Sequence, residues 1–376
     1  MKFRVSDEQA MLRDTVRRFA ARELAPAYLR QIDANAAPPH RSLLPRMAAL
    51  GFTALPVPLA DGGLGGSTVD ATLMLEELGR ASLTAASILD SAIGFGFEMI
   101  KRLGSPAQKR ELFEPLVRGE MCFAFSPAQS DADADAAVCV TRATTDGDGF
   151  IIDGAALLTP AAGEARCLIV AAGMGADLRL FAVNPRSAGI RMRRIETLGM
   201  RAAGGLYEVD YERVRVPAGA LLGSGAAATA TLLAACDRAR TLQAAWCIGC
   251  AQQAIDDAVR YGGEREQFGQ PIGRFQAIAH LLVDLQVDVD AARCLLYRAA
   301  WAADEGLAGP AYATLANIAA TEALLRVTSD AMRVDGGYGL TMEFDIQRHF
   351  RDARSLAGAG GTVHLQRDAV AQAMGL

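Results

Sequence analysis

The sequence predicts an α+β protein in three parts: an N-terminal helical domain, a middle antiparallel β-barrel or sandwich domain, and a C-terminal helical bundle. Three observations lead to this prediction. Apolar residues recur at helical spacing up to residue 120, change to short strand-like runs over residues 121–222, and return to helical spacing over residues 223–376. Because no helical stretch interrupts the middle region, its strands are expected to form one module.

The N-terminal part begins with a helix signal. Ser6 and Gln9 have the spacing of a capping box. Apolar residues follow at helical intervals: Met11, Leu12, Val16 and Phe19. Residues 70–82 form a second amphipathic pattern, and the Pro- and Gly-rich residues 55–67 between them are predicted to be a loop.

The middle part contains strand signals only. Residues 138–153 are typical of a strand, a tight turn at DGDG and a second strand. The runs CLIVAAG and LRLFAV are short and apolar, and residues 207–217 alternate apolar with polar side chains as a half-buried strand does.

The C-terminal part is Ala-rich and helical, with breaks at residues 262–273 and 335–344. Cys247 and Cys250 form a C-x-x-C inside one of the apolar helical runs. A single pair cannot supply the four ligands of a structural zinc site, so both are predicted to be packing thiols and no metal site is expected.

The composition limits the classes of function. Of 376 residues, 51% are hydrophobic and 22% charged, with a net charge of −5, which suits a buried globular core and gives no support for binding nucleic acid. No apolar run is long enough to suggest a membrane span, and the polar N-terminus shows no signal peptide. Seven scattered cysteines indicate reduced thiols and a cytoplasmic protein.

Four motifs in order resemble those of the acyl-CoA dehydrogenase family. Residues 265–285 are similar to the family's R-x-x-F-G-x-x-I-x-x-x-Q signature, and residues 333–354 to its Q-x-x-G-G-x-G loop and the following R-x-x-R-D-A-R helix. Residues 196–217 resemble the strand pair that closes its middle domain, and residues 55–67 its P-x-x-x-G-G-L-G turn. The resemblance extends over essentially the whole chain.

This resemblance implies an FAD-dependent oxidoreductase that dehydrogenates an acyl thioester. It also implies a homo- or hetero-oligomer, a dimer or tetramer, that passes electrons to an electron-transfer flavoprotein. The residues that it assigns to FAD are Arg265 for the diphosphate, Phe268 for the adenine end, Gln276, Gly336 and Gly337 for close backbone approach, and Thr362 at a helix start.

The catalytic base is missing from both positions that the family uses. In the C-terminal loop the acid most often stands directly before G-T, where this chain has Gly360. The alternative acid precedes an Arg that contacts substrate; that Arg is Arg240 and the preceding residue is Ala239. Asp237 lies about 200° around a regular helix from position 239, so it substitutes only if the helix is irregular there.

The residues expected at the flavin ring also depart from the family. Its T-E-P-G-A-G-S-D segment corresponds to residues 125–133, and its W/F-I-T-N loop to residues 158–165. The Thr that would reach flavin N5 falls on Pro160, which has no donor, so Thr159 is the candidate after a shift of one residue. The Gln that opens the Q-x-x-G-G loop is Arg333.

Three functions therefore remain open. The first is a dehydrogenase with a relocated base, acting for example on a fatty acid or a steroid side chain. The second is a catalytically degenerate structural subunit of a hetero-oligomer. The third is a flavin oxygenase or oxidase of the same fold, which needs no α-proton base.

Overall fold

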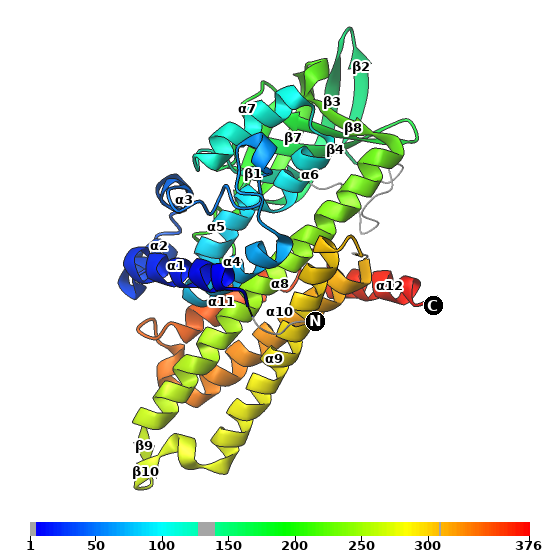
Figure 1. Cartoon of the computed structure of the whole chain (residues 1–376). Coiled ribbons are helices and arrows are strands. Elements are labelled where there is room, and N and C mark those ends of the chain that lie inside the picture. The colour runs from blue at the N-terminus through cyan, green and yellow to red at the C-terminus, as the bar shows by residue number, and fades with distance from the viewer. Residues whose placement is uncertain (1–4, 127–139, 308–309) are drawn as a thin grey trace.

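The computed structural model describes residues 5–126, 140–307 and 310–376. A helical N-terminal part packs beside a sheet, and long helices of the C-terminal part run away from that sheet (Figure 1). The N-terminal helices are α1 (Asp7–Glu23), α2 (Pro26–Ala34), α3 (His40–Ala48), α4 (Thr68–Ala81), α5 (Leu83–Ile93), α6 (Phe95–Leu103) and α7 (Pro106–Val117), with a short 3-10 turn, η1 (Leu59–Asp61).

The N-terminal helices begin where the sequence predicts. Ser6 caps α1, accepting from the Gln9 backbone N–H at 3.1 Å while the Gln9 side chain accepts from the Ser6 N–H at 3.0 Å, so the capping box is confirmed. The helix predicted over residues 70–82 is α4, which begins slightly earlier because Ser67 and Asp70 form a second capping box.

The middle part is one sheet in the order β6-β7-β3-β2-β4-β5-β8, with β1 paired to β4. Its strands are β1 (Phe123–Ser126), β2 (Arg142–Asp146), β3 (Gly149–Pro160), β4 (Cys167–Met174), β5 (Asp177–Val183), β6 (Ile190–Ile195), β7 (Leu206–Val216) and β8 (Leu221–Ser224), with a 3-10 turn, η2 (Ala218–Ala220), before β8. Most strands of this middle domain pair antiparallel, as expected, but the sheet is mixed because β1 and one residue pair of β2 run parallel to β4.

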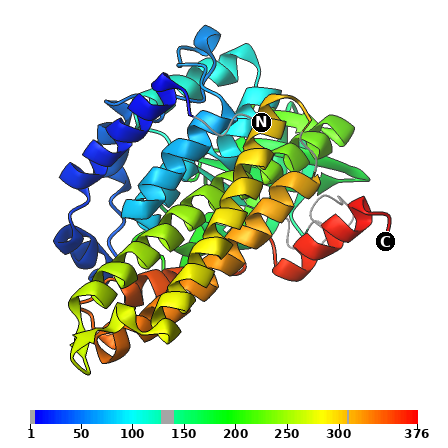
Figure 2. The ribbon, with the colours of Figure 1, turned by 60° about the horizontal axis from the view of Figure 1, so that its bottom comes forward.

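The C-terminal part consists of three long helices, α8 (Gly225–Glu264), α9 (Gln276–Asp304) and α10 (Pro310–Asp335), which lie side by side (Figure 2). The hairpin of β9 (Glu266–Gln267) and β10 (Gln270–Pro271) and the turn η3 (Ile272–Arg274) join α8 to α9 at the end far from the sheet (Figure 1). The chain ends with η4 (Gly336–Leu340), α11 (Ile346–Leu356) and α12 (Val363–Ala373).

Small residues allow the central helix α8 to approach α4 closely. A Cβ on Gly249 of α8 would lie 2.0 Å from the backbone oxygen of Glu76, and one on Gly79 of α4 would lie 2.5 Å from that of Trp246. Neither position therefore tolerates a side chain without a shift of the two helices. This close contact holds the middle of α8 against α4.

Cys247 and Cys250 are fully buried in α8, as packing thiols should be. Burial raises the pKa of both thiols above the ordinary value, which keeps them protonated. One stretch, Leu83–Leu103, has the length and composition of a membrane span, but 78% of its apolar window is buried in this fold and Gly94 separates it into α5 and α6.

Candidate active site

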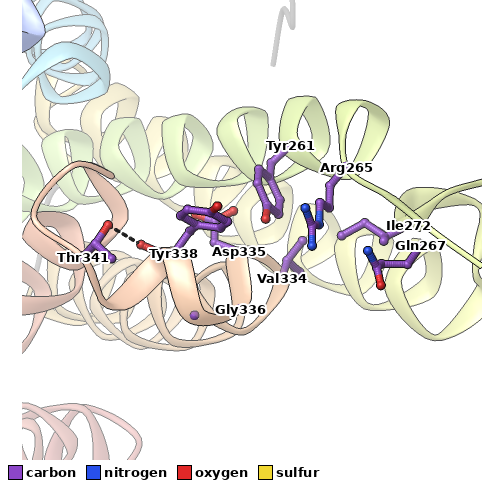
Figure 3. A pocket seen from close by; sticks show the side chains of 10 residues that line it. Tyr261, Arg265, Gln267, Ile272, Val334, Asp335, Gly336, Tyr338 and Thr341 are labelled. Atoms are coloured by element: carbon purple, nitrogen blue, oxygen red, sulfur yellow. Dashed lines mark hydrogen bonds between the residues drawn. The ribbon is translucent and has the colours of Figure 1, made fainter.

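A cavity of about 460 Å³ lies where the end of α8 meets the start of η4 (Figure 3). Arg265, directly after α8, and Gly336 and Gly337, directly after α10, all line it. The rest of its lining comes from the same two chain segments: Tyr261, Gln267, Ile272, Val334, Asp335, Tyr338 and Thr341. The structure thus brings together three of the six residues that the resemblance assigns to FAD.

The glycines of this cavity leave their backbone open. A Cβ on Gly336 or on Gly337 would meet no atom within 4 Å, and Gly336 has φ +60°, a conformation that favours glycine. A ligand can therefore reach the main chain at both residues. Thr341 donates its hydroxyl to the Tyr338 carbonyl at 2.8 Å and holds the turn that follows (Figure 3).

The other three predicted FAD residues lie outside this lining. Phe268, at the tip of the β9–β10 hairpin, is 93% exposed, and Gln276 is exposed at the first position of α9. Thr362 is the N-cap of α12, where its hydroxyl accepts from the Leu365 N–H at 3.3 Å. Arg333 is directed to solvent and pairs with Asp330 at 2.8 Å.

A second cluster surrounds the loop between α11 and α12. Three successive carbonyls of this loop accept hydrogen bonds from side chains: Ala359 from Gln243 at 3.2 Å, Gly360 from the Arg240 Nε at 3.1 Å, and Gly361 from Gln366 at 2.8 Å. Gly360 has φ +76°, and a Cβ there would lie 3.2 Å from the Asn317 amide nitrogen and 3.3 Å from the Gln243 amide oxygen. The position that carries an acid in the family is therefore packed as a glycine.

Asp237 lies beside this loop through Arg240. Its carboxylate is 3.7 Å from the Arg240 guanidinium one turn along α8, and its side chain is 18% exposed. Burial raises the pKa of Asp237, and the positive charge of Arg240 opposes that rise. α8 is helical throughout Gly225–Glu264, so the irregular helix that the sequence required for Asp237 to act as the base is not found. Asp237 is connected to the loop through its i, i+3 contact with Arg240, which bonds the Gly360 carbonyl.

Strand β3 carries the residues expected at the flavin ring. Thr159 and Pro160 are its last two residues, paired with Tyr207 and Leu206 of β7, so they belong to a strand and not to the loop expected over residues 158–165. Thr159 is fully buried and its hydroxyl has no hydrogen-bond partner among the described residues. Of residues 125–133, Phe125 and Ser126 form the end of β1, and the remainder lie outside the described residues.

Comparison with known proteins decides the family. The N-terminal domain model of acyl-CoA dehydrogenases matches residues 6–120, and the C-terminal domain model matches residues 223–375. Benzylmalonyl-CoA dehydrogenase of Aromatoleum aromaticum is 33% identical, and the probable acyl-CoA dehydrogenase YngJ of Bacillus subtilis is 31% identical, each alignment covering 99% of both chains. The chain belongs to the acyl-CoA dehydrogenase family. The structure of butyryl-CoA dehydrogenase from Megasphaera elsdenii is similar over 100% of both chains, with a TM-score of 0.94 and 28% identity.

The cofactor of this acyl-CoA dehydrogenase is FAD, and the residues present fit it. Arg265 offers a planar cation for the diphosphate, and the open backbone at Gly336 and Gly337 allows the close approach that the resemblance requires. The Thr159 hydroxyl is buried and has no partner among the described residues, so it is available to a polar atom of a bound ligand.

Two acids in this acyl-CoA dehydrogenase were missed by sequence reasoning. Asp335 lines the cavity, and burial raises its pKa to about 6. Asp90 on α5 has a buried oxygen without a partner among the described residues, and burial raises its pKa to about 7 against the nearby Arg238. The signal for Asp335 was present, since an acid directly before G-G stands beside a site expected to bind a diphosphate. Asp90 gave no signal, because one acid in an apolar helix is usually at its surface.

Proposed function

We propose that this acyl-CoA dehydrogenase removes the α-proton of an acyl-CoA with Asp237 as the base. FAD-dependent α,β-dehydrogenation of an acyl-CoA is the reaction that the family relationship supports, and neither a structural subunit nor an oxygenase is favoured by it. The observation that supports Asp237 is its contact with Arg240, whose Nε holds the carbonyl of Gly360, the residue at the family's acid position.

Asp237 has the properties of a general base. Its carboxylate is largely shielded from water, and burial raises its pKa, which makes the ionised form a stronger proton acceptor. The positive charge of Arg240 opposes the rise in pKa and favours the ionised form. Such tuning suits removal of the weakly acidic proton next to a thioester carbonyl.

The other residues of the site would bind FAD and orient the groups around the substrate. When bound, FAD supplies the acceptor for the hydride that leaves the β-carbon. Arg265, Gly336 and Gly337 would hold its diphosphate, and the Thr159 hydroxyl would bind its ring. Arg240 positions Asp237 on one side and the loop carbonyl on the other, and it is also the residue assigned to substrate.

The proposal also includes an oligomeric state, an electron acceptor and a location in the cell. The exposed apolar side chains near the cavity, Phe268, Tyr338, Leu340 and Met342, support an oligomer in which a neighbouring subunit covers this end. An electron-transfer flavoprotein is the proposed electron acceptor. Five cysteines in the described residues, Cys122, Cys167, Cys247, Cys250 and Cys294, are free thiols, which supports a cytoplasmic location. We also propose the division into domains at residues 1–120, 121–222 and 223–376.

The test is anaerobic reduction of the FAD-loaded protein by acyl-CoAs of short, long, branched and polycyclic type. Bleaching of the flavin band near ~450 nm reports the whole reaction, and exchange of the substrate α-proton with deuterated solvent reports the base alone. We expect Asp237→Asn to slow both by about 10²- to 10⁴-fold, as loss of a general base does. Asp237→Glu should restore part of the rate with an altered pH profile.

Asp284→Asn is the matched control, because Asp284 is an exposed acid on α9. It should leave both rates unchanged. Exchange and bleaching at the wild-type rate in Asp237→Asn would exclude Asp237 as the base. Retained FAD with no bleaching by any acyl-CoA would overturn dehydrogenation by this chain alone and favour the structural subunit.

A further inference from the structure

Asp335 is a buried acid with an oxygen that lacks a partner. It is the last residue of α10 and is 6% exposed, yet it lines the cavity together with Arg265 and Gly336 (Figure 3). Its Oδ1 is buried and accepts no hydrogen bond from the described residues. Because a buried unsatisfied acceptor costs free energy, a side chain retained in this position needs a donor from elsewhere.

The neighbouring charges do not supply that donor. Arg260 of α8 lowers the pKa of Asp335 by its charge, but it donates its hydrogen bond to Asp257 at 2.9 Å. Burial and, after it, the Asp257 carboxylate raise the pKa of Asp335 to about 6. Arg265, Tyr261 and Tyr338 also face the cavity, but no hydrogen bond joins them to Asp335 among the described contacts. Asp335 thus lines the cavity and carries an oxygen that no described residue bonds.

The chemical groups of FAD limit which of its atoms can donate a hydrogen bond to Asp335. A diphosphate carries no hydrogen-bond donor at neutral pH, so it cannot satisfy Asp335. The adenosine part of FAD carries O–H donors on its ribose and an N–H donor on its adenine. Carboxylates that bind ribose hydroxyls are a recurring device in dinucleotide sites.

We propose that Asp335 accepts a hydrogen bond from the adenosine part of FAD and thereby sets the affinity of this protein for its cofactor. The Gln that opens this loop in the family pattern is Arg333, which faces solvent and pairs with Asp330. Asp335, two residues later, is the carboxylate among the residues that line the cavity. The inference rests on the FAD dependence of the protein and not on Asp237 as its base.

The test measures FAD affinity of the full-length holoenzyme without any substrate, so its result is independent of the dehydrogenation assay. Free FAD is quantified by its fluorescence after serial dilution of the wild type, Asp335→Ala, Asp335→Asn and Asp330→Asn. We expect about tenfold weaker binding in Asp335→Ala and a smaller loss in Asp335→Asn, whose amide oxygen still accepts. Asp330→Asn, on the same helix but outside the cavity, should bind FAD as the wild type does.

FAD analogues identify the donor. Analogues lacking the adenosine 2′-hydroxyl, the 3′-hydroxyl or the adenine amine are compared on the wild type and on Asp335→Ala. One analogue should lose affinity on the wild type and lose none on Asp335→Ala, since the missing partner is then already absent. Equal affinity of all analogues for the wild type, or equal or tighter FAD binding by both Asp335 variants, would overturn the proposal and assign Asp335 to repulsion or packing. Circular dichroism confirms that each variant is folded.

Discussion

Replacement of Thr159 by Val should change the stability of the apoprotein and the affinity for FAD in opposite directions. The side chains have nearly the same shape, but Val lacks the hydroxyl, and that hydroxyl is buried on β3 with no partner among the described residues. Without FAD the hydroxyl is desolvated and unsatisfied, so Val should stabilise the apoprotein. With FAD bound, the same change should remove a hydrogen bond to the ring.

The magnitudes follow from the cost of an unmade hydrogen bond. A buried unsatisfied hydroxyl costs about 1–3 kcal/mol, so Thr159→Val should stabilise the apoprotein by about 1 kcal/mol after partial relaxation. For a chain of 376 residues the unfolding entropy is about 0.8 kcal/mol/K, so the Tm of the apoprotein should rise by about 1 °C. Loss of one net hydrogen bond of about 0.5–1.5 kcal/mol should weaken FAD binding by roughly 2- to 12-fold.

The assay compares Tm by calorimetry with and without saturating FAD, and FAD affinity by fluorescence. Thr159→Ser is the control, because it keeps the hydroxyl and removes a methyl group: its apoprotein should be less stable while its FAD affinity stays near that of the wild type. A Val variant with a less stable apoprotein would show that the hydroxyl is satisfied within the protein. Unchanged FAD affinity in that variant would show that the ring does not use it.

Two further predictions concern the loop glycine and the buried acid of α5. Gly360→Ala should lower the Tm by about 1–3 °C in calorimetry, because φ +76° strains an L-residue by about 1–2 kcal/mol and the new Cβ crowds Asn317 and Gln243. Gly358→Ala is the control, because a Cβ there meets no atom within 4 Å. Equal stability of the two variants would refute the reasoning. Asp90→Asn should gain stability relative to the wild type as pH rises from 5 to 8. Burial raises the pKa of Asp90 from 3.8 to about 7, so the stability that protonated Asp90 contributes is full below pH 3.8 and is lost as pH rises through 7. A Tm difference between variant and wild type that is the same at both pH values would contradict this.

The order of helices and strands could be predicted because it depends on local periodicity. The capping box at Ser6 and the change of spacing near residue 121 depend on neighbouring residues only. The direction of β1 could not be predicted in this way. Its parallel pairing with β4 joins Phe123 to Cys167, and nothing near Phe123 specifies a partner so distant in the sequence.

The candidate site could be predicted only in part, because contacts between distant segments of the chain are not visible in local patterns. Arg265, Gly336 and Gly337 come from two segments that the resemblance joins, and they do line one cavity. The role of Asp237 required the geometry of α8, because the sequence allowed it as a base only in an irregular helix, whereas α8 is helical from Gly225 onward and Asp237 contacts Arg240 one turn along it. Likewise the strand position of Thr159 depends on its pairing with Tyr207, which single-strand patterns do not reveal.

Gly360 is best understood through the backbone of its loop. A simple loss of the acid would leave the neighbours of that side chain unsatisfied, yet Arg240 and Gln243 both donate to the loop, at Gly360 and Ala359. Asn317 donates to Gln366 at 3.0 Å, and Gln366 in turn holds Gly361. This network uses carbonyls that any residue provides. A Cβ at Gly360 would lie 3.2 Å from Asn317 and 3.3 Å from Gln243, so these side chains would have to move by a few tenths of an ångström. Because φ +76° also disfavours an L-residue, an acid restored at this position is expected to strain the loop and displace these neighbours.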